Sequence, residues 1–137
     1  MRIALALAAL LCVSRAHTAD APKLGDAVGK LKFTDTRSLP RTLDDFGKPK
    51  AIVFAFVNTT CPLAQRYLPT LNAIESEYRA KGVQFVAVNA DDSDTLIAAA
   101  SHAVKYDLAF PVVKDFGGAC AKALGATRTP EVVVLDA

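Results

Sequence analysis

The segment that most constrains the fold is residues 51–69, where an unbroken apolar run leads into a cysteine, a proline and a helical pattern. The run over 51–57 is rich in Val, Ile and Phe, which is typical of a strand buried on both faces of a parallel sheet. Pro62 favours the first position of a helix, because it has no N–H to leave unpaired there. The sequence therefore places Cys61 at a helix N-terminus and at the carboxyl end of a central strand, where open α/β sheets carry their active sites.

This position favours the thiolate form of Cys61, because a helix N-terminus offers free N–H groups and the positive end of the helix dipole. Cys61 is therefore the candidate nucleophile for attack on a disulfide or on the O–O bond of a peroxide. The hydroxyl groups of Thr59 and Thr60 are candidate hydrogen-bond donors to the sulfur or to a bound oxygen. The alternative is a small buried cysteine that only packs at the start of the helix.

Further elements are predicted on both sides of this segment. A helix over 62–81 carries one apolar stripe, made of Leu63, Tyr67, Leu71, Ile74 and Tyr78. An N-terminal hairpin or extended arm precedes the apolar strand. After the helix, the pattern predicts a strand over 83–88, a helix over 95–106, an extended segment over 110–113, a short helix over 118–124 and a last strand over 131–136. This order is typical of an α/β layered domain.

The N-terminus has the pattern of a secretory signal peptide over residues 1–16. Arg2 supplies a positive charge, an apolar stretch follows, and Ser14 and Ala16 provide small residues for cleavage near Ala16 or Ala19. The apolar stretch is too short for a membrane span. We therefore expect an exported protein, periplasmic or extracytoplasmic, with no membrane span after cleavage; an uncleaved short anchor is the alternative.

Composition excludes some partners and leaves the cysteine pairing open. The net charge is +2 and the chain has no basic stripe, so we expect no nucleic-acid partner. Cys12 falls within the leader, which leaves Cys61 and Cys120 in an oxidising compartment, where they are either paired or free. Neither cysteine has zinc-site spacing, and we expect His102 to lie partly exposed on the surface of a helix. The acidic residues 91–94 are interpreted as helix caps, with a metal site as the sharper alternative.

Several of these features together resemble the thioredoxin-like superfamily, specifically its redoxin branch, to which the alkyl hydroperoxide reductase and thiol-specific antioxidant proteins belong. They are the lead-in over 43–48, Cys61 at its helix, Pro69 eight residues later, Gly125 followed by Thr129-Pro130, and the strand after them. The resemblance covers residues 24–137, with 17–23 as a linker. It implies a three-layer sandwich around a central mixed sheet with an N-terminal extension, truncated after the last strand and without C-terminal elements.

The resemblance also implies roles for individual residues. Pro130 corresponds to the cis-proline of the family, so that Thr129 presents its backbone to a substrate strand beside the sulfur. Thioredoxins carry a second cysteine where this chain has Ala64, and a buried acidic residue where it has Ala55. Peroxiredoxins carry Pro and Thr or Ser where this chain has Phe54 and Asn58, and an arginine for which Arg66 and Arg128 are candidate substitutes.

The sequence therefore predicts an exported thiol-dependent redox protein, either a thiol-disulfide oxidoreductase or an antioxidant thiol peroxidase. Cys61 is its nucleophile, Cys120 is either a resolving thiol or a core residue, and Thr59, Thr60, Pro62, Thr129 and Pro130 position the substrate. We expect no metal and no cofactor, and a thiol reductant, a disulfide-bearing protein or a peroxide as partner. The alternative is a non-catalytic binding or electron-transfer module of a larger protein, in which a fused redox domain follows Ala137.

Overall fold

The computed structural model describes residues 22–136. The expected signal peptide over 1–16, residues 17–21 of the expected linker and Ala137 lie outside the described residues. Within the described part of the chain, no helix is long and apolar enough to cross a membrane.

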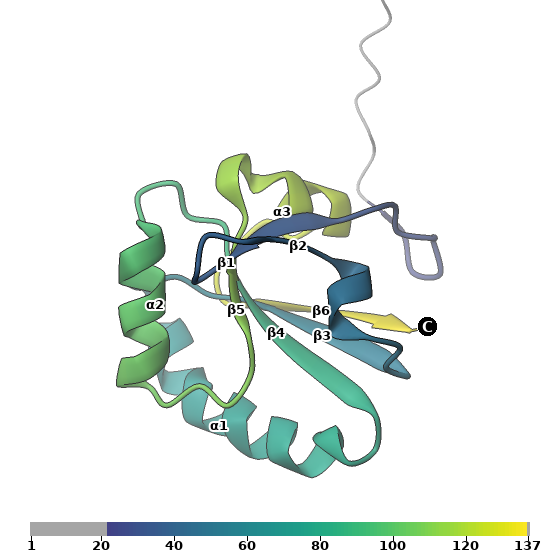
Figure 1. The fold of residues 1–137 in the computed structure, drawn as a ribbon, viewed down its shortest axis with the longest axis horizontal. Coiled ribbons are helices and arrows are strands. Elements are labelled where there is room, and N and C mark those ends of the chain that lie inside the picture. The colour runs from purple at the N-terminus through teal and green to yellow at the C-terminus, as the bar shows by residue number, and fades with distance from the viewer. Residues whose placement is uncertain (1–21, 137) are drawn as a thin grey trace, which may run out of the picture.

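Six strands form one mixed sheet in the order β2-β1-β5-β4-β3-β6 (Figure 1). Their bounds are β1 Lys32–Asp35, β2 Pro40–Thr42, β3 Ala51–Phe56, β4 Val83–Asn89, β5 Val112–Lys114 and β6 Glu131–Asp136. Strands β3, β4 and β5 run parallel, whereas β6 pairs antiparallel with β3 and β1 pairs antiparallel with β5. The strand that leads to Cys61 is therefore β3, which lies between β4 and β6 and is one strand in from the edge of the sheet rather than at its centre.

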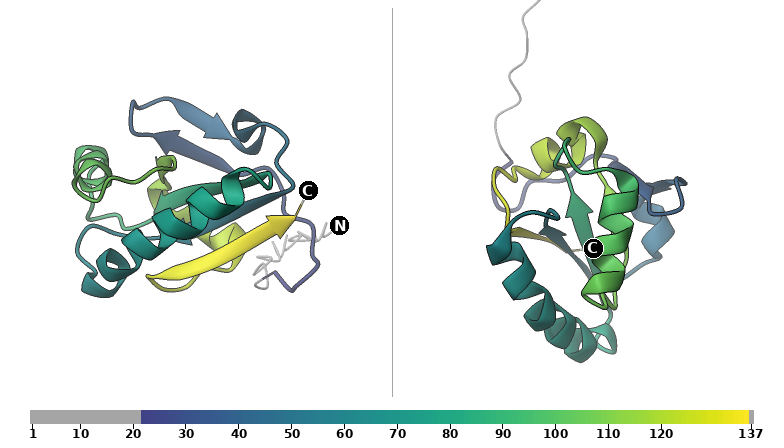
Figure 2. Two further views of the ribbon diagram at one scale, coloured as in Figure 1. Left: turned by 90° about the horizontal axis from the view of Figure 1, so that it is seen from below. Right: turned by 90° about the vertical axis from the view of Figure 1, so that its left-hand side faces the viewer.

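Helices cover both faces of this sheet, which confirms the predicted thioredoxin-like three-layer architecture. They are α1 Pro62–Arg79, α2 Leu96–Lys105 and α3 Ala119–Leu124, with short 3-10 turns η1 Leu43–Phe46 and η2 Phe116–Gly118. Helices α1 and α3 lie on opposite sides of the sheet in both figures that show the whole fold (Figures 1 and 2). Alternate residues of the buried strands point to the two sides, so Val53 packs with Leu68 of α1 while Phe54 packs with Leu124 of α3.

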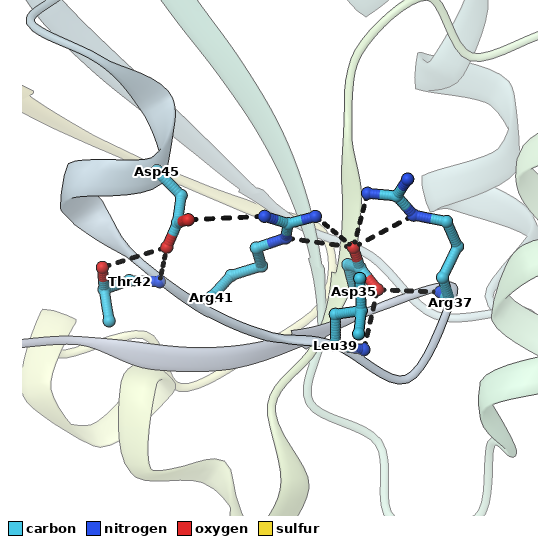
Figure 3. A network of polar contacts seen from close by, with 6 residues as sticks. All are labelled: Asp35, Arg37, Leu39, Arg41, Thr42 and Asp45. Atoms are coloured by element: carbon cyan, nitrogen blue, oxygen red, sulfur yellow. Dashed lines mark hydrogen bonds and ion pairs between the residues drawn. The ribbon is translucent and has the colours of Figure 1, made fainter.

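The N-terminal extension is a β1–β2 hairpin that Asp35 holds together (Figure 3). Its carboxylate accepts hydrogen bonds from the backbone N–H groups of Leu39 and Arg37. It also accepts from the guanidinium groups of Arg37 and Arg41, with Arg41 Nη2 at 2.9 Å. The N–H of Leu39, the guanidinium of Arg41 and the two donors of Arg37 outweigh desolvation and hold the pKa of Asp35 well below its usual range. Strand β1 then pairs with β5, and this joins the hairpin to the main sheet.

Of the apolar stripe predicted on α1, only Leu71 packs against the buried cluster on this side of the sheet. Ala64, Leu68 and Glu75 face the sheet, whereas Leu63, Tyr67, Ile74 and Tyr78 are 40–51% exposed. The exposed stripe continues onto β6, where Val132 and Val134 are more than half exposed. The reason is that small Ala64 lets the helix approach the sheet closely along the neighbouring face, and no residue among 22–136 covers the stripe.

His102 also differs from the expectation of a partly exposed surface side chain. It is buried in α2, its ring lies 4.7 Å from that of Tyr106, and its Nε2 atom has no hydrogen-bond partner within the described residues. The Ala-rich sequence of α2 brings this helix close to β5, which explains why its histidine is buried.

Candidate active site

Cys61 is the N-cap residue of α1, as predicted, and its sulfur has two backbone partners. The N–H of Ala64 donates to Sγ across 3.5 Å, and the thiol donates to the carbonyl oxygen of Thr129 across 3.7 Å. Pro62 occupies the first helical position. Cys61 is partly exposed and lies beyond the carboxyl end of β3.

Residues 58–60 form the loop that presents Cys61, and none of their side chains is hydrogen-bonded to its sulfur. The Asn58 side-chain oxygen accepts a hydrogen bond from the Cys61 N–H at 2.8 Å. The Thr59 hydroxyl donates to Asp94, so it is not free to donate to the thiolate. Thr60 is exposed. The expected hydrogen bond from Thr59 to the sulfur is therefore absent, and the loop's interactions hold the backbone instead.

A second loop, residues 127–130, lies against the sulfur from the side of β6. The peptide bond between Thr129 and Pro130 is cis, as the resemblance implied. Glu131 accepts hydrogen bonds from the N–H groups of Thr127 at 2.7 Å and Arg128 at 3.1 Å. These two bonds hold the pKa of Glu131 below its usual value despite some desolvation. An ionised Glu131 therefore fixes the loop that places the Thr129 carbonyl group beside Cys61.

Two of the departures from the thioredoxin pattern lie on one hollow between β3, α1 and the start of β6. Ala55 and Ala64 line the same hollow of about 330 Å³, whose other walls are apolar side chains of β3 and α1 and the segment Pro130, Glu131 and Val132. The positions that carry a buried acid and a second cysteine in thioredoxins are thus adjacent and apolar here. Neither supplies a proton acceptor or a resolving thiol to Cys61. The candidate substitutes Arg66 and Arg128 are both exposed.

Cys120 is not brought to Cys61. Both are free thiols, but Cys120 lies on the buried side of α3 and packs with Phe54, whereas Cys61 packs with the cluster under α1, on the other face of the sheet. Burial and the neighbouring Asp115 carboxylate raise the pKa of the Cys120 thiol to about 12. In this conformation Cys120 has the position and protonation of a core residue rather than of a resolving thiol.

The acidic residues 91–94 were expected to cap the second helix, and the structure corrects this. Thr95 is the N-cap residue of α2 and accepts a hydrogen bond from the Ala98 N–H at 3.0 Å. Asp91 and Asp94 instead bind Asn58 and Thr59. No group of three or more His, Cys, Asp or Glu residues among 22–136 is arranged to hold a metal ion. The sequence does not reveal the contact between these acids and the Cys61 loop, because more than 30 residues separate them.

This fold and this cysteine site are those of a thioredoxin-like protein, and the chain belongs to the Redoxin family, whose model matches residues 23–137. This also confirms the thioredoxin-like superfamily and its redoxin branch as the correct assignment. The match includes the β1–β2 hairpin, the Cys61 loop and the cis-proline loop.

Among particular proteins, the chain is 32% identical over 114 residues to a thiol-disulfide oxidoreductase ResA from Bacillus thuringiensis. The aligned part is 83% of this chain and 64% of the relative, so the chain spans less than two thirds of that relative's length. A hypothetical protein from Sinorhizobium meliloti superposes with a TM-score of 0.78 at 27% identity, covering 85% of this chain and 67% of the other. A thioredoxin-like protein from Aeropyrum pernix shares the fold with a TM-score of 0.67 at 15% identity, covering 78% and 74%.

Proposed function

We propose that this protein carries out thiol-disulfide exchange through the single cysteine Cys61. The observation that supports this most directly is the position of the sulfur, which accepts a hydrogen bond from the Ala64 N–H and faces the Thr129 carbonyl group beside a cis-proline. A helix N-terminus stabilises the thiolate, which is the attacking species. The similarity to relatives named thiol-disulfide oxidoreductases supports the same reaction class.

The reaction proceeds in two exchanges. The Cys61 thiolate attacks one sulfur of a substrate disulfide, the S–S bond breaks, and the other sulfur departs as a thiolate, leaving Cys61 in a mixed disulfide. Since position 64 is alanine and Cys120 lies across the sheet, neither releases this intermediate. A thiolate of a separate reductant attacks the substrate sulfur of the mixed disulfide, forms a disulfide between the reductant and the substrate, and releases Cys61 as a thiolate. The partners are thus a disulfide-bearing protein and a thiol reductant.

The experiment is to incubate the protein with oxidised glutathione and to identify adducts by peptide mass spectrometry. We expect a mixed disulfide on Cys61, none in the Cys61→Ser variant, and an unchanged yield in the Cys120→Ser variant. Hydrogen peroxide, followed by trapping of sulfenic acid, tests the peroxidase chemistry in the same samples. If peroxide oxidises Cys61 while glutathione leaves it unmodified, thiol-disulfide exchange is the wrong reaction.

The second candidate is a binding or electron-transfer module without turnover, and the alanines at 55 and 64 favour it. A module of this kind binds its partner without forming a covalent link. If the Cys61→Ser variant retains full affinity for a partner and wild-type protein forms no mixed disulfide, the module is the correct function.

We also propose that the protein is exported to a periplasmic or other extracytoplasmic compartment. The support is the pattern of Arg2, the apolar stretch and the small residues Ser14 and Ala16. Sequencing the N-terminus of the protein expressed in its full form tests this. We expect the mature chain to begin at His17 or Asp20, and a chain that keeps residues 1–16 would contradict cleavage.

A further inference from the structure

A buried polar network lies behind the Cys61 loop, where the parallel strands β3, β4 and β5 end. Asn89 ends β4, Lys114 ends β5, and Asp94 belongs to the segment after β4; all three are at most 7% exposed. Buried polar groups cost stability unless they are paired, so a network like this is maintained only where its hydrogen bonds are satisfied.

The network ends on the backbone of the Cys61 loop. Asp94 accepts hydrogen bonds from both the N–H of Thr59, at 2.8 Å, and the Thr59 hydroxyl. Its Oδ2 also accepts from the Asn89 side-chain amide at 2.6 Å. Burial alone would raise the pKa of Asp94, but the hydrogen bonds from Thr59 and Asn89 outweigh burial and hold it below its usual value. Asp94 is therefore an ionised acceptor at neutral pH.

A second branch reaches Cys61 itself. Asp91 accepts from the Asn58 side-chain amide at 2.9 Å, and the other end of that amide accepts the Cys61 N–H. Lys114 joins the branches, because its ammonium donates to the Asn89 side-chain oxygen at 2.9 Å and to the backbone oxygen of Asp91. Lys114 is 1% exposed, and its positive charge acts on the Asp91 carboxylate.

From this arrangement we propose that Asp94 is a positioning residue for Cys61. By fixing Thr59 it holds the loop that keeps the Cys61 sulfur in hydrogen-bond contact with the Ala64 N–H at the helix N-terminus. Asn89 orients the Asp94 carboxylate, and Lys114 holds the Asn89 side chain in turn. This inference rests on the proposed function, since it concerns the reactivity of the same thiol.

The test compares the alkylation rate of Cys61 by iodoacetamide, followed by peptide mass spectrometry, in wild type, Asp94→Asn, Thr59→Val and the double variant. Asp92→Asn is the matched control, because Asp92 is exposed and its one hydrogen bond, at 3.3 Å, goes to the Gly117 N–H rather than to the loop. We expect each single variant to alkylate about threefold to tenfold more slowly at pH 7, the loss expected when a thiolate leaves a helix N-terminus. The double variant should be no slower than the slower single variant, because both changes break the same contact. Asp92→Asn and Thr59→Ser should keep the wild-type rate.

The direction of the change separates positioning from simple electrostatics. If Asp94 acts only through its negative charge, Asp94→Asn makes Cys61 react faster at pH 7 and Thr59→Val leaves it unchanged, which overturns the proposal. Wild-type rates in both single variants, with only a lower melting temperature, also overturn it. If Asp94→Asn does not fold, Thr59→Val alone decides, since it removes the hydroxyl and keeps the carboxylate. A wild-type rate equal to that of a free cysteine contradicts the proposed function instead, independently of the variants.

Discussion

Cys120 lies on the buried side of α3 and is 1% exposed, so its surroundings determine how reactive its thiol is. Burial and the Asp115 carboxylate raise its pKa to about 12, so the thiol stays protonated at pH 8. Burial also keeps a reagent from reaching it. We therefore predict that iodoacetamide at pH 8 modifies Cys61 in the native protein and leaves Cys120 unmodified, whereas both react in denaturant. Peptide mass spectrometry measures both sites in one sample, with denatured protein as control. Equal native labelling of the two cysteines would show that α3 opens readily.

At the scale of elements, α3 depends on a cap that comes from outside the helix. The Asp115 carboxylate accepts hydrogen bonds from the N–H groups of Cys120 at 2.9 Å and Ala121 at 2.8 Å. Asp115→Ala leaves these two donors unpaired in the interior, so we predict a loss of about 1–3 kcal/mol in the free energy of unfolding. Urea denaturation measures the loss, and Asp44→Ala, which alters an exposed aspartate, should be nearly neutral. A loss equal to that of Asp44→Ala would mean that water replaces the cap.

The elements themselves were largely predictable, because their signals are local. The apolar run of β3, the Cys61-Pro62 junction and Gly125 at the end of α3 are each specified by a few neighbouring residues, and the structure confirms them. The face that α1 buries was not predictable in the same way. Its apolar stripe shows that a helix forms, but contact with the sheet is decided by which residues allow close approach, and Ala64 does so better than Leu63 or Tyr67.

At the scale of the whole molecule, the order of the parallel strands, and not a sequence motif, brings the residues of the site together. The sequence identified Cys61 and the cis-proline loop, since both carry local signals, but it did not identify Asp94 as their support. Asn89 and Lys114 end β4 and β5, and Asn58 follows the end of β3, so only the parallel order of these three strands brings the residues together. A side-chain network of this kind has no spacing that can be recognised in one sequence.

The stability of the whole molecule should depend on pH through His102. Desolvation, followed by the nearby charge of Lys105, lowers its pKa below the ordinary 6.5, while Asp94 acts weakly in the opposite direction. The unfolded chain therefore binds a proton first as the pH falls below about 6.5, so acidification favours unfolding until the lowered pKa of the folded state is reached. One such proton contributes at most about 1.4 kcal/mol per pH unit to the slope. The Asp91 and Asp94 carboxyl groups, whose pKa values are lowered, titrate below this window.

We predict that urea denaturation of wild type shows falling stability between pH 7 and 5, and that His102→Phe, which keeps an aromatic ring against Tyr106, shows a flatter profile. Parallel profiles for the two proteins would mean that the buried imidazole does not govern acid sensitivity in this range.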